Sequence, residues 1–348
     1  MSNRIVTFGE IMLRLKSPGH ERLLQSPLLE ATFGGGEANV AVSLAQFGCE
    51  VSFISALPDN PIADACLGFL RGKGVDVKGI LRQGPRMGAY YLEAGANQRP
   101  SRVVYDRQHS SIMDTPAESY DWPGLFEGAR WFHITGITPA LSANAANVTL
   151  QAMKTAHDMG LTVTLDYNFR KNLWKYGKPA SEVMRSLIKY VDIGIANEED
   201  CQYSLGIPLE SDSGEKEPDC GQLDPERYRQ LCERVFESFP NLKIQTITLR
   251  SSHSADHNGW AACLYNGKDF LLSRQYDVTD IVDRVGTGDS FVAGLIYALS
   301  VGSSEKDALE FATAASCLKH SIPGDMNFCT IEEVKALVAG AINGRIRR

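Results

Sequence analysis

The sequence contains no hydrophobic run long enough to cross a membrane. Its most apolar stretch, residues 291–299, is far shorter than the roughly 20 residues that a membrane-spanning helix needs. The opening residues 1–4 lead directly into a strand-like segment and lack the apolar core of a signal peptide. We therefore expect a cytoplasmic protein that does not contact membranes.

An excess of positive charge is also missing. Lys and Arg total 35 against 42 Asp and Glu, which gives a formal net charge of −7. A chain of this sign has no general attraction for a nucleic acid backbone, so an anionic ligand must be held by a local group of donors. The 8 cysteines include no Cys-x-x-Cys pair. This usage is typical of a protein from a reducing compartment without a structural zinc site.

Short β-branched runs alternate with helix-length amphipathic segments along most of the chain. Predicted strands lie at residues 5–8, 51–54, 131–134, 161–165 and 244–249. Predicted helices lie at 38–47, 62–73, 143–159, 181–190, 225–239, 289–299, 304–320 and 331–342. This alternation predicts a doubly wound α/β fold, with a mostly parallel sheet flanked by helices on both faces.

One part of the chain interrupts this alternation. Residues 87–93 and 101–107 alternate polar and apolar side chains, which predicts an antiparallel hairpin rather than a strand–helix–strand unit. Residues 12–16 supply a further strand of the same small sheet. We expect these insertions, around 12–34 and 87–108, to form a β-sheet lid that closes over a ligand.

The rest of the chain gives no sign of a second domain. No internal repeat is visible, and the acidic stretch 210–226 has so little to bury that it is predicted to be a solvated loop. We therefore expect one domain that covers residues 1–348 and carries the lid as an insertion.

The most informative segment is Asp283-Arg284-Val285-Gly286-Thr287-Gly288-Asp289. Two glycines within three residues allow successive backbone N–H groups to point into one concavity. A helix that begins at about Asp289 adds unpaired N–H groups and the positive end of its dipole. The amides of Gly286, Thr287 and Gly288 therefore predict an anion site suited to a phosphate group in transfer.

Asp289 needs a different role, because a carboxylate that faced a phosphate would repel it. Facing a neutral partner, it can accept the proton of a nucleophilic hydroxyl, and such general-base help contributes about 10²- to 10⁴-fold. The ordinary alternative is a helix cap. Competing phosphate motifs fail: no Gly-Lys pair continues as a Walker A loop, and Phe291 stands where a dinucleotide-binding loop has its third glycine.

Two segments of the chain match family signatures. Residues 283–291 resemble the C-terminal signature of the ribokinase-like (PfkB) carbohydrate kinases. Gly34-Gly35-Gly36-Glu37-Ala38-Asn39-Val40-Ala41 is similar to their N-terminal signature. The resemblance extends over nearly the whole chain and implies a ribokinase-like α/β fold with a small β-sheet lid. It also implies ATP as phosphoryl donor and Mg²⁺ as its metal, and leaves K⁺ activation open.

Within this family the chain most resembles the 2-keto-3-deoxygluconate kinases. The stretches that carry this closer resemblance are residues 9–15, 104–107, 133–140, 166–170 and 319–325. It implies that Asp289 is the catalytic base and that Gly286, Thr287 and Gly288 form an anion hole. It also implies a sugar-acid site made of Gly35, Tyr90, Tyr105, Arg107, Arg170 and Asp289.

The nucleotide side of the site follows from the same resemblance. It implies nucleotide contacts from Asn197, Thr248, Arg250, Gly286 and Gly288, and metal contacts from Asn197 and Asp200. The chain departs from the family here: the Asn-x-x-Glu motif ends in Asp200, one methylene shorter, and Thr-x-Gly reads Thr248-Leu249-Arg250. Asn197 and Asp200 also have an ordinary alternative role as helix caps.

Two arginines favour an acidic sugar over a neutral one. Arg107 in the hairpin and Arg170 after the predicted strand 161–165 suit a bidentate clamp on a carboxylate. Tyr90 and Tyr105 offer apolar faces and hydroxyls to a sugar chain with one deoxygenated carbon. Taken singly, an arginine near a strand is more often a surface charge, and Tyr90 would more often pack within the lid.

These observations predict an ATP-dependent phosphotransferase. Its expected acceptor is the 6-hydroxyl of 2-keto-3-deoxygluconate, and the product is 2-keto-3-deoxy-6-phosphogluconate, an intermediate of Entner–Doudoroff or uronate breakdown. The alternatives are another PfkB kinase (a fructokinase or other sugar-acid kinase), a non-catalytic sugar sensor on the same fold, and an NAD-linked oxidoreductase, which the failed dinucleotide pattern disfavours. The exposed strands of the lid predict a homo-oligomer.

Overall fold

The computed structural model describes residues 3–197, 199–208 and 224–341. The strands of its main sheet are β1 (Arg4–Phe8), β4 (Val51–Leu57), β5 (Ile80–Arg82), β8 (Ala129–Thr135), β9 (Thr162–Asp166), β10 (Ile193–Asn197), β11 (Ile244–Ser252), β12 (Asn258–Tyr265), β13 (Phe270–Leu272) and β14 (Tyr276–Val278). Within the described ranges they follow the order β13-β12-β11-β10-β9-β8-β1-β4-β5, and β14 pairs with β12. All neighbours from β11 to β5 are parallel, whereas β12, β13 and β14 form an antiparallel edge.

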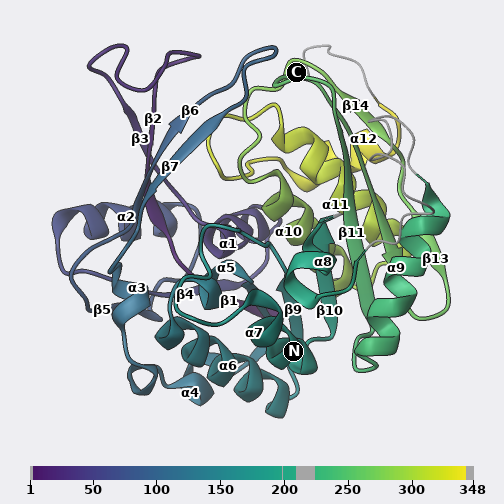
Figure 1. Cartoon of the computed structure of the whole chain (residues 1–348), viewed down its shortest axis with the longest axis horizontal. Helices are drawn as coiled ribbons and strands as arrows, with labels where there is room; N and C mark the ends of the chain where they lie inside the picture. The colour runs from purple at the N-terminus through teal and green to yellow at the C-terminus, as the bar shows by residue number, and fades with distance from the viewer. Residues whose placement is uncertain (1–2, 198, 209–223, 342–348) are drawn as a thin grey trace.

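Helices cover both faces of this sheet (Figure 1). One face packs against α1 (Gly36–Gln46), α2 (Pro61–Gly72), α10 (Thr287–Ser300), α11 (Glu305–Lys319) and α12 (Ile331–Val338). The other packs against α3 (Ser111–Asp114), α4 (Trp122–Phe126), α5 (Ile137–Ala140), α6 (Ala143–Asp158), α7 (Ala180–Leu187), α8 (Asp200–Leu205) and α9 (Pro225–Ser238). Adjacent strand residues divide between the two cores: Ile5 belongs to the first and Val6 to the second. This arrangement confirms the predicted fold. In the described part of the chain, no helix has the length and apolarity to cross a membrane.

A second, smaller sheet stands above the main body (Figure 1). Its strands are β2 (Met12–Lys16), β3 (Glu30–Gly34), β6 (Ala89–Glu93) and β7 (Arg102–Asp106). They follow the order β3-β2-β6-β7, in which β6 and β7 form the predicted antiparallel hairpin. The tip of this hairpin reaches the loop after β11, where the Ala255 N–H donates to the Asn97 carbonyl at 2.7 Å. The hairpin therefore bridges two parts of the molecule.

Predicted and observed boundaries differ at a few places. They agree within three residues, except that α12 ends at Val338 and does not reach residue 342. The sequence analysis missed β3, β5, β10 and the antiparallel edge β12 to β14. Every residue of β12 is buried, so the strand shows no polar–apolar alternation by which to recognise it. The predicted acidic loop 210–226 lies largely outside the described residues, and Pro225 and Glu226 form the first turn of α9.

Candidate active site

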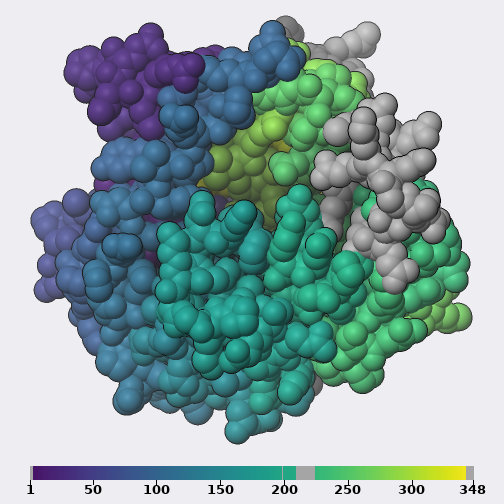
Figure 2. All heavy atoms as spheres, viewed as in Figure 1, coloured from purple at the N-terminus to yellow at the C-terminus, as the bar shows by residue number. Residues whose placement is uncertain are grey.

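A cavity of about 920 Å³ opens between the small sheet and the carboxyl ends of the parallel strands. Figure 2 shows the surface hollowed below the β6–β7 hairpin, beside the segments that follow residue 250. Ligands of open α/β sheets bind at this end of the strands, because the loops and helix N-termini converge there. The cavity is therefore the candidate active site.

The residues singled out from the sequence all line this cavity. They are Gly35, Tyr90, Tyr105, Arg107, Arg170, Asn197, Asp200, Thr248, Arg250, Gly286, Thr287, Gly288 and Asp289. They come from the small sheet, from the N-terminal ends of α1 and α10, and from the ends of β9, β10 and β11. The fold thus brings together side chains that are more than 200 residues apart.

The glycine loop forms the N-terminal end of α10. The helix begins at Thr287, two residues before the predicted start. Gly286 has a φ of 81°, and a Cβ there would lie 1.7 Å from the Asp325 carbonyl oxygen, so only glycine fits. A Cβ at Gly288 would meet nothing within 4 Å. The loop therefore leaves room for a ligand beside the first N–H groups of a helix, a geometry suited to a phosphate-sized anion.

Asp289 lies in the first turn of α10 and is partly exposed to the cavity. Its Oδ2 accepts a hydrogen bond from Asn39 Nδ2 at 2.7 Å. Desolvation raises the pKa of Asp289 to about 6, with a contribution from Asp325, while the Asn39 hydrogen bond and Arg170 act in the opposite direction. Such a carboxylate is ionised at neutral pH and basic enough to accept a proton. Gly286, and not Asp289, is the N-cap of α10, and the helix has no side-chain cap hydrogen bond.

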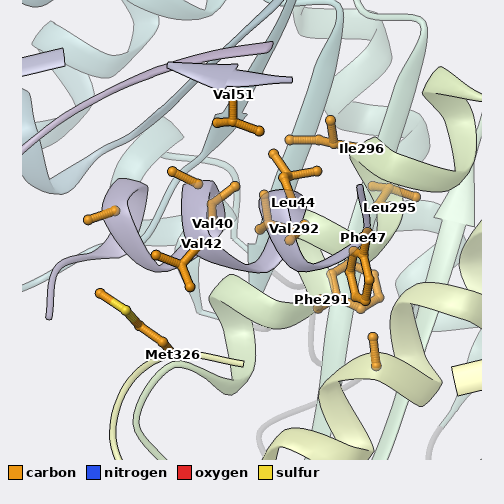
Figure 3. Packing of buried hydrophobic residues seen from close by; sticks show 14 of the residues in the cluster. Val40, Val42, Leu44, Phe47, Val51, Phe291, Val292, Leu295, Ile296 and Met326 are labelled. Atoms are coloured by element: carbon orange, nitrogen blue, oxygen red, sulfur yellow. The ribbon is translucent and has the colours of Figure 1, made fainter. Parts of the chain in front are cut away.

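Packing of α1 against α10 holds the two signature segments together. Figure 3 shows the shared cluster, in which the labelled side chains of these helices are Val40, Val42, Leu44, Phe291, Val292, Leu295 and Ile296, together with Phe47 at the C-cap of α1. At the N-cap of α1, a Cβ on Gly35 would lie 2.0 Å from the Glu10 carbonyl oxygen. A Cβ on the next residue, Gly36, would lie 3.6 Å from Asp289 Oδ1. The start of α1 thus forms the cavity wall next to Asp289.

The small sheet contributes two tyrosines to the cavity. Tyr90 and Tyr105 are cross-strand partners on β6 and β7, with ring centroids 6.0 Å apart. Tyr90 is buried, and its hydroxyl donates to Asp325 Oδ2 at 2.6 Å. Tyr105 is half-exposed and presents its ring to the guanidinium of Arg107, 5.3 Å from the ring centroid. Tyr90 therefore has a hydrogen-bond partner within the protein, whereas Tyr105 is half-exposed and lines the cavity.

Arg107 is buried and already carries a carboxylate partner. Its Nη2 forms an ion pair with Glu10, whose other oxygen accepts from Ser110 Oγ at 2.6 Å. Arg107 Nε has no hydrogen-bond partner among the described residues. Glu10 therefore holds the guanidinium in one orientation, and Nε remains a buried donor without a partner in the described chain. The sequence analysis did not identify Glu10, because an ion pair across 97 residues has no local pattern.

Arg170 enters the cavity from the loop after β9. It is exposed, and its Nη1 donates to the Phe169 carbonyl at 2.8 Å. Asn168, at a φ of 40°, turns the chain here and donates to Asp166 Oδ2 at 3.1 Å. Asp166 is buried at the cavity, and desolvation, followed by the nearby Asp200 and Asp289, raises its pKa. The sequence analysis did not single out Asp166. The pattern that could have identified it is an acidic residue at the carboxyl end of a core strand.

Asn197 and Asp200 close the turn between β10 and α8. The two oxygens of Asp200 accept the backbone N–H groups of Phe169 and Asn197, each at 2.9 Å. Asn197 Oδ1 accepts those of Glu199 and Asp200. The N-cap of α8 is Glu199, without a side-chain cap hydrogen bond, so Asn197 and Asp200 stabilise the turn before the helix and are not its N-cap residues. Both residues also line the cavity, so their role in the turn does not exclude a contact with a ligand.

Positive charge gathers where β11 reaches the cavity. Arg284 Nη2 donates to Asn258 Oδ1 at 2.9 Å and to the Ser254 carbonyl. Burial, followed by the neighbouring Arg250, lowers the pKa of Arg284, so these two cations lie close enough to repel each other. Thr248 Oγ1 donates to the Ala196 carbonyl at 3.4 Å. Two adjacent cations suit an anionic ligand, which would relieve their repulsion.

Comparison with known proteins shows the family of this chain. The pfkB family carbohydrate kinase model matches residues 2–227 and 258–332. The chain belongs to the PfkB family of carbohydrate kinases. The chain is 44% identical in sequence to a 2-dehydro-3-deoxygluconokinase from Thermotoga maritima whose crystal structure is known. The two structures match with a TM-score of 0.89 over 97% of this chain and 99% of that chain.

Curated relatives of this PfkB kinase match over almost its full length. A 2-dehydro-3-deoxygalactonokinase from Haloferax volcanii is 31% identical, over 99% of both chains. A 2-dehydro-3-deoxygluconokinase from Bacillus subtilis is 28% identical, over 92% of this chain and 91% of the relative. As a carbohydrate kinase, the protein is an enzyme that transfers a phosphoryl group to a sugar hydroxyl.

The cavity of this PfkB kinase can be tested for a divalent metal. Within residues 3–197, 199–208 and 224–341, no group of three or more His, Cys, Asp or Glu could hold a metal ion. Mg²⁺ commonly takes only one or two protein carboxylates and keeps substrate phosphates and waters as its other ligands. Asp166 and Asp200 fit that role, because the charge of Asp200 raises the pKa of Asp166 and a cation would relieve this repulsion. The residues present therefore fit a metal that is held mainly by phosphates.

Proposed function

We propose that the protein transfers the γ-phosphoryl group of ATP to the 6-hydroxyl of 2-keto-3-deoxygluconate, also called 2-dehydro-3-deoxygluconate. The products are ADP and 2-keto-3-deoxy-6-phosphogluconate. The observation that carries the proposal is one cavity that holds both an anion loop with an adjacent carboxylate and two arginines, Arg107 and Arg170. The 44% identical Thermotoga maritima structure is that of a 2-dehydro-3-deoxygluconokinase, which supports the choice of acceptor.

The chemistry follows from Asp289 and the glycine loop. Asp289 accepts the proton of the 6-hydroxyl while the alcohol oxygen forms a bond to the γ-phosphorus. The bond from that phosphorus to the β–γ bridging oxygen breaks, and ADP leaves. The amides of Gly286, Thr287 and Gly288 stabilise the negative charge on the transferring group. Mg²⁺, when bound with ATP, offsets further phosphate charge.

Carboxylate recognition is assigned to the two arginines. The pair Glu10–Arg107 fixes the direction of one guanidinium and leaves Nε, a buried donor, for the sugar acid. Arg170 is exposed at the cavity and adds a second positive charge. Charge-assisted bonds of this kind are stronger than neutral ones and favour an acid over a neutral sugar. Gly35, Tyr90 and Tyr105 complete the sugar site.

The nucleotide occupies the other walls of the cavity in this proposal. Asn197, Thr248, Arg250, Gly286 and Gly288 bind ATP, and Asn197 and Asp200, with the neighbouring Asp166, would hold Mg²⁺ together with the phosphates. The protein acts as a single domain, with the small sheet as its lid. The contact of Asn97 with Ala255 at the hairpin tip supports closure, which excludes water from the transfer. The exposed residues of β7 are offered as the contact of a homo-oligomer.

The Haloferax volcanii relative favours a second candidate. That relative is a 2-dehydro-3-deoxygalactonokinase, and its sugar acid differs from the gluconate in configuration at a single carbon. Other PfkB kinases act on neutral sugars, as the fructokinases among the relatives do by name. The proposal therefore has to be separated from another sugar acid and from a neutral sugar.

A substrate panel tests the assignment. Release of ADP is measured with 2-keto-3-deoxygluconate, 2-keto-3-deoxygalactonate, gluconate, fructose and ribose, and phosphorus NMR locates the phosphate on the product. We expect kcat/KM for 2-keto-3-deoxygluconate to exceed that for the neutral sugars by about 100-fold or more, because a sugar without a carboxylate leaves the buried donor Arg107 Nε unpaired. Equal turnover of fructose, or a phosphate on another carbon, would overturn the proposal.

A further inference from the structure

Arg14 occupies an unusual place in the small sheet. It lies on β2 with only 1% of its surface exposed, and its two terminal nitrogens form ion pairs with Asp283 and Asp325. Its cross-strand neighbour Tyr90 donates to Asp325 as well, at 2.6 Å. The small sheet is thus tied, through buried charges, to two residues that lie about 270 and 310 positions later in the chain.

The same two aspartates hold the glycine loop. Asp283 Oδ1 accepts the Val285 N–H at 3.0 Å, and its Oδ2 accepts the Gly324 N–H at 3.1 Å. The backbone of Asp325 packs directly on Gly286, where an added Cβ would lie 1.7 Å from the Asp325 carbonyl oxygen. The guanidinium therefore bridges the two chain segments that determine where Gly286 and the following amides lie.

Stabilisation of the folded state does not by itself account for the buried charges of Arg14, Asp283 and Asp325. Desolvation of buried charges offsets much of their Coulomb attraction, and apolar side chains of similar volume often stabilise a protein equally well. A planar guanidinium provides geometry instead, because its donors fix the directions of two carboxylates at once. In the described part of the chain Arg14 does not line the cavity, so it acts through Asp283 and Asp325 and not on a ligand.

We propose that Arg14 is a positioning residue for phosphoryl transfer: it holds Asp283 and Asp325 and so aligns the glycine loop with Asp289 while the small sheet is in place. The inference rests on the proposed roles of Asp289 and the loop, and it does not depend on which sugar is phosphorylated. It makes the small sheet part of the catalytic geometry as well as a cover over the ligand.

The cluster also sets the charge around Asp289. The groups that act on this carboxylate include Asp325, which raises its pKa, and Asn39, Arg170 and Lys319, which lower it. The buried Asp166 is also a neighbour, because the charge of Asp289 contributes to the raised pKa of Asp166. Lys319 is buried and also faces Arg14, Asp283 and Asp325. Within this cluster, the positive charges of Arg14 and Lys319 balance the negative charges of Asp283 and Asp325. Loss of the Arg14 charge leaves one uncompensated negative charge, which shifts the pKa of Asp289 upward.

The test compares Arg14→Gln and Arg14→Lys with the control Lys16→Met. Lys16 lies two residues along the same strand and pairs with the exposed Glu30 at 3.3 Å. Using whichever sugar the unmodified enzyme phosphorylates best, we expect Arg14→Gln to lower kcat about 10-fold or more with KM values changed less than about 3-fold. The acid limb of the pH profile, where kcat falls as the pH decreases, should move to higher pH in Arg14→Gln. Arg14→Lys should restore that limb but only part of kcat, and Lys16→Met should change neither.

Two results would overturn the inference: a folded Arg14→Gln variant with unchanged kcat and pH profile, or an effect confined to KM. If Arg14→Gln does not fold, the charge-balanced Arg14→Gln/Asp325→Asn variant replaces it. We expect that variant to keep the acid limb and lose kcat, and normal kcat would contradict positioning. If no sugar is phosphorylated, the proposed function fails instead. Hydrogen exchange of the backbone amides of residues 283–289 then tests whether Arg14 positions the loop. We expect faster exchange in Arg14→Gln than in Lys16→Met.

Discussion

Asn39 and Asp289 lie 250 residues apart in the chain, yet the Asn39 amide donates to the Asp289 carboxylate at 2.7 Å. Asn39 is in the first turns of α1, and Asp289 is in the first turn of α10. The bond therefore joins the helix starts of the two signature segments and fixes one oxygen of the carboxylate. The other oxygen, Oδ1, lies near Gly36 at the cavity wall. This arrangement fixes the orientation of the Asp289 carboxylate, as its proposed role as a base requires.

Asp289→Asn tests the carboxylate as a base. The amide is nearly the same size but cannot accept the proton, so we expect kcat to fall by at least about 10²-fold. Ligand binding and thermal stability should change little, because Asn39 can still bond to the new oxygen. Steady-state kinetics, with melting curves as a control for folding, provide the measurement. Near-normal turnover would remove Asp289 from its proposed role.

The pH profile tests the environment of Asp289. Only the ionised carboxylate accepts a proton, and its pKa is raised from 3.8 to about 6, so kcat/KM should reach half of its plateau near pH 6 and level off about one pH unit higher. Asn39→Ala removes the hydrogen bond that lowers this pKa, and the acid limb should then move to higher pH. Initial rates across the acid range check both points. A limb that stays near pH 4 in both proteins would show that another group controls the rate.

Arginine substitutions test recognition of an acid. Arg170→Ala is the cleaner change, because Arg170 is exposed, whereas loss of Arg107 leaves Glu10 buried without its partner. Each should raise KM for the sugar acid about 10-fold or more, as expected for a charge-assisted bond of about 1.5–3 kcal/mol. KM for a neutral sugar should change little.

The matched control for these variants is Arg86→Ala. Arg86 pairs with Asp106 at 2.7 Å at the end of β7 and is exposed. Arg86→Ala removes the same single positive charge close to the hairpin, and it should leave KM for the sugar acid unchanged. Equal losses with acidic and neutral sugars would argue against carboxylate recognition by Arg107 and Arg170.

Gly286→Ala tests the close contact beneath the anion loop. The new Cβ would meet the Asp325 carbonyl oxygen at 1.7 Å, and φ is 81°, so the loop has to move. We expect a large loss of kcat and destabilisation by about 1–3 kcal/mol, the usual cost of such backbone strain. Gly68→Ala, in an open helical position of α2, is the control and should preserve both activity and stability. Normal activity of Gly286→Ala would show that the loop tolerates displacement.

Local patterns were sufficient for much of the fold and for part of the site. The alternation of strands and helices depends on side-chain periodicity within each segment, so the α/β class and most boundaries followed from the sequence. The glycine loop was recognisable for the same reason, because a positive φ and a helix start are properties of a few neighbouring residues. Strand β12 was not predicted, because all of its residues are buried and it therefore has no alternation of polar and apolar side chains.

Long-range partners were beyond these patterns. The pairing of Arg107 with Glu10, and of Arg14 with Asp283 and Asp325, joins residues 97 to 311 positions apart. Such pairs exist only once the chain has packed, because nothing in the spacing of one sequence says which distant charges will meet in a low-dielectric interior. Types of residue and local backbone form were therefore readable from the chain, whereas the neighbours of each ionised group, and hence its pKa and direction, came from packing of the small sheet, α1 and α10 around one cavity.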